Sequence, residues 1–435
     1  MEFWSIILPM KSMNFTCSPA LEVIRCWALD THLEIHVVGG WVRDSLLGLP
    51  AWDADLTGPH LPQELESLLP EDGSVTLHTR DAGLGTVELH AGGEIFEYTA
   101  FRKESYRPGG AHRPTEVTLG ATLREDALRR DFSVNAIYWS LADESLQDPT
   151  GGIDDLALRR LRTTRAAQDV FNEDGLRLLR LIRQSAELDF AIEPDTLSAA
   201  KARIAYLSDI APERLREELR RILCADTRHP EKEYSRSPVL HALDLMQELS
   251  AWDYLCPQAK ALCEDPARKQ SAASAPAQDT LRLACLWVGL DADTVLACAQ
   301  RLRFSREEEK QIAFLCAHAR KDLSRDKFRL LAAHAGLPYA KVLTQFRSIL
   351  AASNLSPAQV QEPFWLQEML EDCCPFDLKQ VNISGKDLMA LCGGPSPRIG
   401  ILKNRLFDHC ILFPQDNQTD ILIRLAQDMM EHETV

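Results

Sequence analysis

The sequence has no apolar run long enough to cross a membrane, which takes about 20 consecutive residues in a helix. Its first 15 residues contain a short apolar stretch but have no basic leader and no Ala-x-Ala cleavage site, so they do not predict a signal peptide. We therefore expect a cytoplasmic protein that binds no membrane.

Cysteine pairs of the C-x-x-C type are also absent. The twelve cysteines are scattered from Cys17 to Cys410, and only Cys373 and Cys374 are adjacent. This pattern favours buried, reduced thiols over zinc sites or disulfides, which again suits the cytoplasm.

Positive charge is in short supply, with 48 Lys and Arg against 64 Asp and Glu and a formal net charge of −16. Contacts to nucleic-acid phosphates need Lys and Arg, so any RNA-binding surface has to be a local basic patch. Candidate patches lie at residues 159–165, 301–347 and 398–405.

The 435 residues, 45% of them hydrophobic, have ordinary globular composition and suffice for two to four domains. Strand patterns dominate up to about residue 150, among them Gly85–His90 and Glu94–Phe101, which a glycine turn joins as a predicted hairpin. From Ile153 onward the apolar residues recur at helical spacing, except in segment 264–279, which indicates a linker or long surface loop. Strands followed by helices predict an α+β fold, with a mixed-sheet head and an all-α remainder.

A glycine pair and two aspartates lie close together in the segment Val37–Gly58, VVGGWVRDSLLGLPAWDADLTG. A buried strand ends at Gly39 and Gly40 and a helix follows, an arrangement that lets a phosphate approach the backbone. Asp53 and Asp55 are predicted on a second strand, where both carboxylates point to one face. Each motif alone is weak, but their order and spacing predict a Mg²⁺ site for nucleotidyl transfer.

Two further segments add charged candidates. Glu97 lies on the strand Glu94–Phe101 and could complete the metal site, although a solvated strand glutamate is equally consistent with the sequence. The segment Arg102–Pro114 contains Gly, Pro and no apolar period, and it predicts a mobile loop. Its basic residues would lie near a triphosphate or simply in solvent: Arg102, Lys103, Arg107 and Arg113.

The segment EDALRRDFSVNA places Arg129, Arg130 and Asp131 shortly before Asn135. The planar guanidinium of arginine suits a triphosphate, and Asp131 and Asn135 could order a ribose hydroxyl. Capping and salt bridging would explain the same residues without a ligand. The following segment, FSVNAIYWSL, is compatible with either a strand or a helix.

The segment NEDGLRLLRLIR predicts a helix with Asn172 as its N-cap. Asp174 and Arg177 are three residues apart and therefore neighbours on a helix, and Arg177, Arg180 and Arg183 repeat every three residues. The charged face of this helix is either a salt-bridged surface or a protein edge that reads a base, because Asp accepts from an amino group and Arg donates to ring nitrogens and carbonyls.

The order and spacing of these motifs resemble the class II template-independent RNA nucleotidyltransferases, which include bacterial CCA-adding enzymes and bacterial poly(A) polymerases. The resemblance rests on GGWVRDSLLG, DAD, EYTAFRKESYRPGGAHRP, EDALRRDFSVNA, DPTGGIDDL and EDGLRLLRLIR, and it is densest over residues 37–190. The segment ISGKDLMALCGGPSPRIGILKNRL resembles the tail of bacterial members. The resemblance to this family implies a head (1–150), a neck (151–212), a body (213–279) and a tRNA-binding tail (280–435).

The resemblance also implies residue roles. The nucleotide-binding set comprises Gly39, Gly40, Arg43, Arg102, Arg130, Asp131, Asn135, Asp174, Arg177, Arg180 and Arg183. Asp53 and Asp55 would bind Mg²⁺, with Glu97 as a further catalytic acid, and segment 102–114 would help to switch from C to A addition. Asp174 and Arg177 would pair with CTP or ATP in place of a nucleic-acid template.

The implied reaction is attack of a tRNA 3′-hydroxyl on the α-phosphate of CTP or ATP, adding CCA. The expected partners are tRNA, CTP and ATP, with no obligate protein partner. A CC-adding enzyme, a poly(A) polymerase and a catalytically silent RNA-binding protein on the same fold remain alternatives. No HD-type phosphohydrolase motif occurs in the C-terminal half, so only nucleotidyl transfer is expected.

Overall fold

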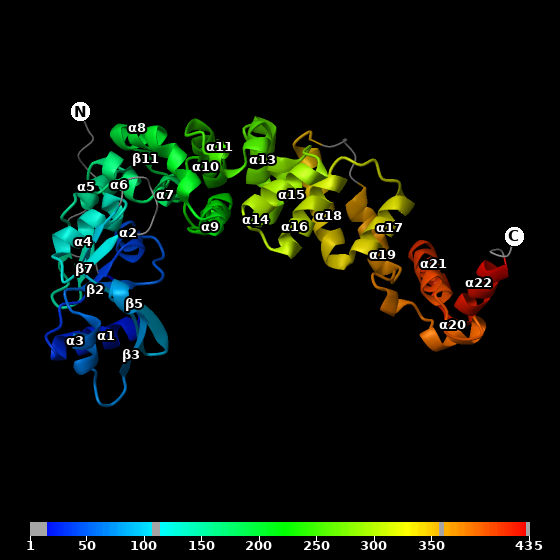
Figure 1. Cartoon of the computed structure of the whole chain (residues 1–435), viewed down its shortest axis with the longest axis horizontal. Helices are drawn as coiled ribbons and strands as arrows, with labels where there is room; N and C mark the ends of the chain where they lie inside the picture. Colours follow the sequence, from blue (N-terminus) through cyan, green and yellow to red (C-terminus); the bar gives the residue numbers. More distant parts are fainter. Residues whose placement is uncertain (1–14, 107–113, 356–360, 432–435) are drawn as a thin grey trace. The chain divides into compact units, whose positions relative to one another are not determined.

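The computed structural model describes residues 15–106, 114–355 and 361–431. The chain divides into two units, Met1–Lys260 and Ala261–Val435 (Figure 1). The boundary falls within the segment that the sequence predicts as the body. All the strands of the described residues belong to the first unit, and helices follow. The predicted α+β class is confirmed.

A seven-stranded mixed sheet forms the centre of the first unit, in the order β3-β4-β5-β2-β1-β8-β9. Strands β2 and β5 are parallel, and the other neighbours are antiparallel. The strands are β1 (His36–Val38), β2 (Asp55–Gly58), β3 (Val75–Asp81), β4 (Thr86–Ala91), β5 (Glu94–Ala100), β8 (Tyr138–Ser140) and β9 (Leu146–Gln147). Two smaller ribbons join β6 (Arg102–Ser105) to β7 (Glu116–Leu119) and β10 (Arg160–Leu161) to β11 (Ala191–Ile192).

The hairpin predicted from β4 and β5 is confirmed. The two strands pair antiparallel, and the turn between them uses Gly92 and Gly93, both at positive φ. The ambiguous segment 132–141 contains both structures, because a short 3-10 helix (η2, Ser133–Asn135) precedes β8.

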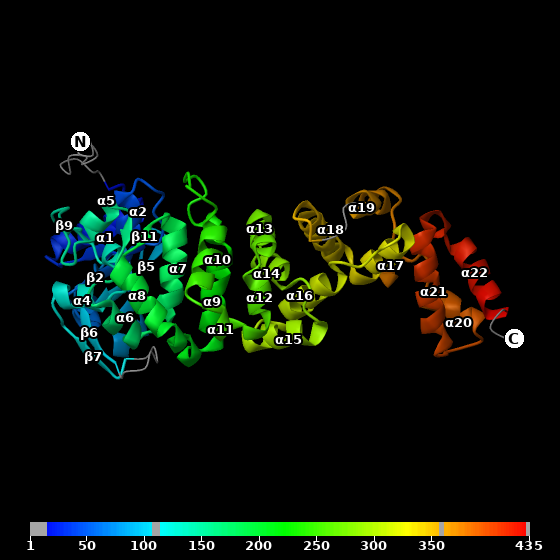
Figure 2. The ribbon, with the colours of Figure 1, turned by 90° about the horizontal axis from the view of Figure 1, so that it is seen from above.

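Helices cover the sheet and extend from it. In the first unit they are α1 (Pro19–Asp30), α2 (Gly40–Leu46), α3 (Pro62–Ser67), α4 (Leu123–Arg129), α5 (Gly152–Ala157), α6 (Ala167–Glu173), α7 (Leu176–Leu188), α8 (Pro194–Arg203), α9 (Pro212–Leu223), α10 (Pro238–Glu248) and α11 (Trp252–Leu255). Helix α7 is buried over nearly its whole length, where it packs against α9 and α10 (Figure 2). A helix with so little exposed surface holds its side chains in fixed positions.

The second unit is helical. After α12 (Lys260–Cys263), which begins at the boundary, its helices are α13 (Pro266–Ser274), α14 (Asp279–Trp287), α15 (Ala292–Arg301), α16 (Arg306–His318), α17 (Arg325–Ala335), α18 (Leu337–Ala352), α19 (Glu362–Glu371), α20 (Gly385–Leu391), α21 (Arg398–Leu412) and α22 (Thr419–Glu431). Helices α17 and α19 to α22 share one apolar core around Phe328, Met369 and Leu406.

Segment 264–279 is not the predicted loop, because α13 occupies most of it. Asp265 caps the helix by accepting from the Arg268 N–H, and Pro266 occupies the first turn, where its missing N–H costs nothing. The Ala, Arg, Lys and Gln residues that follow are good helix formers. The predicted loop is wrong because it gave more weight to the Pro and Ser residues of the segment than to these helix formers.

No helix among the described residues is both long and apolar enough to cross a membrane. Cys263, Cys285 and Cys410 are buried free thiols, as expected. Cys256 and Cys298 are not free thiols, so the prediction of reduced cysteines is wrong for these two.

Candidate active site

The glycine turn and Asp55 are brought together by strand pairing. Strands β1 and β2 place Val38 opposite Asp55, and Gly39 follows β1 directly. Gly39 has a φ of +83°, and a Cβ built on it would lie 3.5 Å from Asp55 Oδ2. The turn therefore needs glycine for its backbone conformation, and the carboxylate lies against the turn, as the motif spacing predicts.

Asp53 reaches the same region by a different route from the predicted one. It precedes β2 and has a left-handed backbone, with a φ of +57°, so strand alternation does not position it. Aspartate tolerates this conformation better than most residues. Asp53 and Asp55 are both accessible to solvent, although surrounding protein atoms displace part of the water around the Asp55 carboxylate.

Glu97 joins the two aspartates through the sheet. The parallel pairing of Leu56 with Tyr98 puts Asp55 and Glu97 on the same face of neighbouring strands. Lost hydration is the main cause that raises the pKa of Asp55 to about 6. The Arg130 guanidinium opposes the rise, and the carboxylates of Glu97 and Asp53 add to it.

These carboxylates fit a divalent cation that binds together with a nucleotide. Among the described residues, no group of three or more Asp, Glu, His or Cys side chains is placed so that it could hold a metal ion by itself. Mg²⁺ usually takes one or two protein carboxylates plus substrate phosphate oxygens, so Asp53 and Asp55 form an adequate protein share. Glu97 accepts instead from Arg80 Nη1 at 2.6 Å.

Arg43 links the glycine turn to the predicted ribose contacts. Its buried guanidinium donates to Asp44 Oδ1 at 2.8 Å and to Asn135 Oδ1 at 2.7 Å. The Asn135 amide then donates to Asp131 Oδ1 at 3.1 Å and to Gln184 Oε1 at 2.9 Å. Helix α2, η2 and helix α7 therefore share one hydrogen-bonded network.

Asp131 is held ionised within this network. Burial alone would raise its pKa, but the Arg180 guanidinium and the Asn135 amide outweigh burial, and the pKa lies well below its ordinary value. Arg180 Nη2 lies 2.6 Å from Asp131 Oδ2. Arg180 is thus already paired with a carboxylate.

Arg130 is held by Asp126, which the sequence did not single out. Arg130 Nη2 lies 3.1 Å from Asp126 Oδ2, and Arg129 Nη2 lies 2.7 Å from Asp126 Oδ1. Burial would raise the pKa of Asp126, but the two arginines and the Tyr138 hydroxyl lower it to about 2. The i,i+3 and i,i+4 spacing from Asp126 to the arginines was the available signal.

Asp174 and Arg177 lie at the junction of α6 and α7. The helix containing Arg177 begins after Gly175 and not at Asn172, which belongs to α6. A Cβ on Gly175 would lie 2.7 Å from the backbone oxygen of Tyr206, so this close approach requires glycine. Asp174 Oδ1 accepts from the Leu176 N–H at 2.9 Å.

Asp174 and Arg177 have different surroundings. Burial is the main cause that raises the pKa of Asp174 to about 6, while the Leu176 N–H and the Arg177 and Arg180 guanidiniums oppose it. Arg177 Nη2 donates to the Arg129 carbonyl oxygen at 2.7 Å. This bond ties α7 to the end of α4.

The remaining predicted arginines have structural partners. Arg183 Nε donates to Glu218 Oε2 at 2.7 Å and its Nη1 to Glu187 Oε2 at 2.9 Å. Arg102 belongs to β6 and donates to Glu104 Oε1 at 2.6 Å, so segment 102–105 is a paired strand rather than part of a loop. Arg107 and Arg113 lie outside the described residues.

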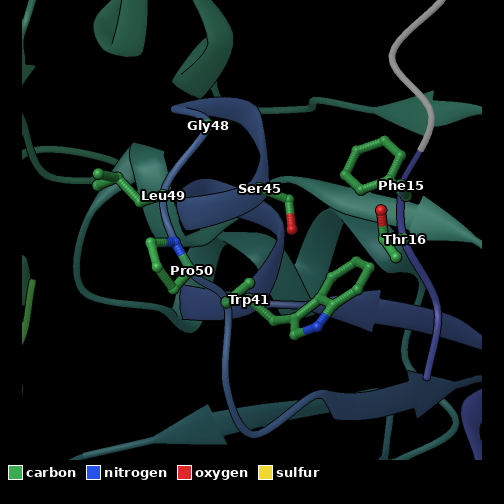
Figure 3. Close-up of a pocket in the computed structure, with 8 residues that line it drawn as sticks. Phe15, Thr16, Trp41, Ser45, Gly48, Leu49 and Pro50 are labelled. Carbon is green, nitrogen blue, oxygen red and sulfur yellow. The ribbon is translucent and has the colours of Figure 1, made fainter. Parts of the chain in front are cut away.

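A cavity of about 410 Å³ lies beside α2 and the loop that follows it. Figure 3 shows Trp41 and Ser45 of α2 facing Phe15 and Thr16, with Leu49 and Pro50 from the following loop. The Phe15 ring stacks on Trp41 and Trp139, with centroid separations of 5.6 and 4.7 Å. The described lining contains none of the predicted site residues, so this cavity is separate from the candidate active site.

Two family models match the first unit. Residues 35–162 match the poly A polymerase head domain, and residues 189–232 match the probable RNA and SrmB-binding site of polymerase A. A mixed-sheet head with paired carboxylates beside a glycine turn, together with these matches, defines a nucleotidyltransferase.

The particular family follows from a relative that matches over most of both chains. The chain is 30% identical over 400 residues to the CCA-adding enzyme of Streptococcus pneumoniae, covering 88% of this chain and 89% of that enzyme. It is 38% identical over 218 residues to the enzyme of Leuconostoc citreum, which is half of each chain. The chain belongs to the CCA-adding enzyme family.

Solved structures have the same fold. The Bacillus stearothermophilus CCA-adding enzyme in complex with CTP matches with a TM-score of 0.77 at 21% identity, over 96% of this chain and 99% of that chain. A tRNA nucleotidyltransferase with a primer tRNA and an incoming ATP analog matches with a TM-score of 0.57 at 20% identity, over 81% and 100% of the two chains.

Proposed function

We propose that this chain adds CCA to the 3′ end of tRNA from CTP and ATP, with Mg²⁺ held by Asp53 and Asp55. The observation that carries the proposal is that the Asp55 carboxylate lies against the Gly39 turn. A Cβ built on Gly39 would lie 3.5 Å from Asp55 Oδ2. Metal-binding carboxylates and a backbone open to phosphate are what nucleotidyl transfer needs in one place. The tRNA and nucleotide substrates support a cytoplasmic location.

The residues divide the chemistry between them. Mg²⁺ at the aspartates would make the RNA 3′-hydroxyl more acidic and neutralise charge on the triphosphate. Gly39 leaves the triphosphate room beside the backbone, so the 3′-hydroxyl can attack the α-phosphorus while the bond to the pyrophosphate oxygen breaks. Asn135 and Asp131 belong to the network around Arg43, which keeps the ribose and phosphate contacts rigid.

Base selection is assigned to the junction of α6 and α7. An ionised Asp174 accepts from the amino group that cytosine and adenine both carry, and Arg177 donates to ring nitrogen or carbonyl acceptors. Gly175 and the Leu176 N–H hold the Asp174 carboxylate in place. The support for this assignment is that Asp174 is constrained between two helices and is not free on a surface loop.

Incorporation of labelled CTP and ATP with Mg²⁺ tests the proposal on three RNAs: tRNA lacking CCA, tRNA ending in CC, and oligoadenylate. We expect two C additions and one A addition, on tRNA only. Asp55→Asn should lower incorporation by about a thousandfold or more, the scale of losing metal-assisted chemistry. Asp72→Asn is the matched control, because Asp72 is an exposed aspartate of the same unit that bonds only locally to Ser74.

Other products would identify the alternatives. Stopping at CC would make the chain a CC-adding enzyme, and long A tails on oligoadenylate would make it a poly(A) polymerase. No incorporation into any RNA would contradict the proposal and favour a silent RNA-binding protein.

A further inference from the structure

Arg228 brings a guanidinium to the glycine turn from a distant part of the chain. It follows the 3-10 helix η4 (Ala225–Thr227) and lies 184 residues from Asp44, to which its Nη2 donates at 3.1 Å. A Cβ built on Gly40 would lie 3.8 Å from the same Nη2 and 3.5 Å from Arg43 Nη2. Two guanidiniums therefore lie beside Gly40.

The local charges do not cancel. Asp44 is fully buried and is shared by Arg43, at 2.6 Å, and Arg228, at 3.1 Å. His229 Nε2 lies 3.7 Å from Asp44, and burial is the main cause that lowers the pKa of His229 to about 4, so the ring is neutral at pH 7. Two positive charges share one negative charge, which leaves one positive charge over for an anion.

Arg228 differs in this respect from Arg180 and Arg183, which were predicted from sequence. Arg180 is paired with Asp131, and Arg183 has both Glu187 and Glu218. The Arg228 side chain shares its acid with Arg43 and keeps 32% of its surface exposed. A ligand at the turn can therefore reach it.

We propose that Arg228 binds the β- and γ-phosphates of the incoming nucleoside triphosphate, together with Arg43. The inference rests on the proposed function and adds a residue to its nucleotide site. Gly39 borders Asp55 and Gly40 borders the two guanidiniums, so a triphosphate with its α-phosphate at the carboxylates extends along the turn toward Arg228. The planar guanidinium can donate two parallel hydrogen bonds to phosphate oxygens.

The placement favours a nucleotide phosphate over the RNA backbone. Arg228 falls in the segment that matches an RNA-binding family model, which alone would suggest RNA. Its Nη2 is bonded to Asp44 of α2, however, and lies at Gly40, so the guanidinium is held against the glycine turn of the head.

Binding of CTP and of CMP to the full-length protein tests this, by calorimetry in Mg²⁺ without RNA. Arg228→Gln should raise the Kd for CTP about tenfold, the size of one charge-assisted hydrogen bond, and leave the Kd for CMP within about twofold. Arg228→Lys keeps the charge and the Asp44 ion pair and should give an intermediate Kd. Arg236→Gln is the matched control, because Arg236 is 46% exposed and paired with the surface residue Asp244 at 3.6 Å.

Four outcomes would overturn the inference. If Arg228→Gln weakens the binding of CTP and of CMP equally and lowers the melting temperature, Arg228 only stabilises the position of Asp44. Unchanged CTP binding with weaker tRNA binding would assign it to the RNA. A wild-type protein that binds CTP no better than CMP would overturn the proposed function as well, whereas a wild-type preference that survives in Arg228→Gln would overturn this inference alone.

Discussion

At the scale of single residues, the arginines of the site fall into two groups. Some have their own carboxylate partner, and others share one carboxylate. The predicted base-reading and phosphate-binding arginines are mostly engaged: Arg180 with Asp131, Arg130 with Asp126 and Arg183 with Glu218. These pairs are largely buried, and removing one partner would leave an uncompensated charge. Many substitutions here will therefore change stability and activity together.

Asp174 allows stability and function to be separated. Its pKa is raised to about 6 from an ordinary 3.8, so ionisation opposes folding, and the stability that the neutral form provides is lost as the pH rises through about 6. Asp174→Asn keeps an oxygen for the Leu176 N–H and removes the charge. We expect it to raise the melting temperature by a few degrees at pH 7.5, about 1 kcal/mol, and by less at pH 5.

The same variant should lose discrimination among CTP, ATP and UTP in single-nucleotide incorporation, because an amide both donates and accepts. Melting curves at the two pH values provide the stability measurement. An equal effect at both values would show that the Asp174 carboxylate is not the group responsible.

At the scale of elements, the junction of α6 and α7 depends on a glycine that composition would count as a weakness. A Cβ on Gly175 would meet the Tyr206 backbone oxygen at 2.7 Å and carbonyl carbon at 3.0 Å, and backbone cannot rotate away as a side chain can. The glycine allows α7 to approach the 3-10 helix η3 (Ile204–Asp209).

Gly175→Ala should lower the free energy of unfolding by about 2 kcal/mol or more. Gly385→Ala is the matched control, because a Cβ there meets nothing within 4 Å and alanine is the better helix former. Urea denaturation of the full chain measures both. Equal stability of the two variants would mean that the junction adjusts easily.

The hairpin of β6 and β7 gives a second test at this scale. The strands pair through four residue pairs, from Arg102–Leu119 to Ser105–Glu116, so the ends of the connecting segment are tied together. Replacing residues 107–113 with Gly and Ser of equal length should leave CTP addition within a fewfold of wild type and abolish ATP addition to tRNA ending in CC. CTP addition is the internal control, and parallel loss of both would contradict a switching role.

At the scale of the whole molecule, every residue proposed to bind metal or nucleotide belongs to the first unit. The chain as a whole is strongly acidic. With a net charge of −16, long-range electrostatics do not favour RNA, so binding depends on local contacts between Lys or Arg and phosphate.

Salt should therefore affect the two substrates unequally. Raising monovalent salt from about 50 to 200 mM should raise the KM for tRNA about tenfold or more if two or more phosphates are contacted. The KM for CTP should change less, since its site includes buried charges that salt screens weakly. Steady-state incorporation at several salt concentrations measures both, and a flat tRNA response would argue against local basic patches.

Sequence patterns were enough to predict the fold class, the β4–β5 hairpin, the glycine turn beside Asp55 and the arginine period of α7. The hairpin and the arginine period follow from neighbours along the chain, because alternation, helical period and turn chemistry act within about ten residues. The order of the motifs was also enough for the family, because several short segments together are specific where one is not.

The hydrogen-bond and ion-pair partners of the site residues depend on contacts between segments that are distant in sequence. Asp53 takes its place from a left-handed turn, α7 begins at Gly175 because Tyr206 packs there, and Asp126 holds two arginines. Arg228 reaches Asp44 across 184 residues. Strand register and helix packing join groups that are far apart in sequence, and no local pattern encodes which carboxylate a given arginine will meet.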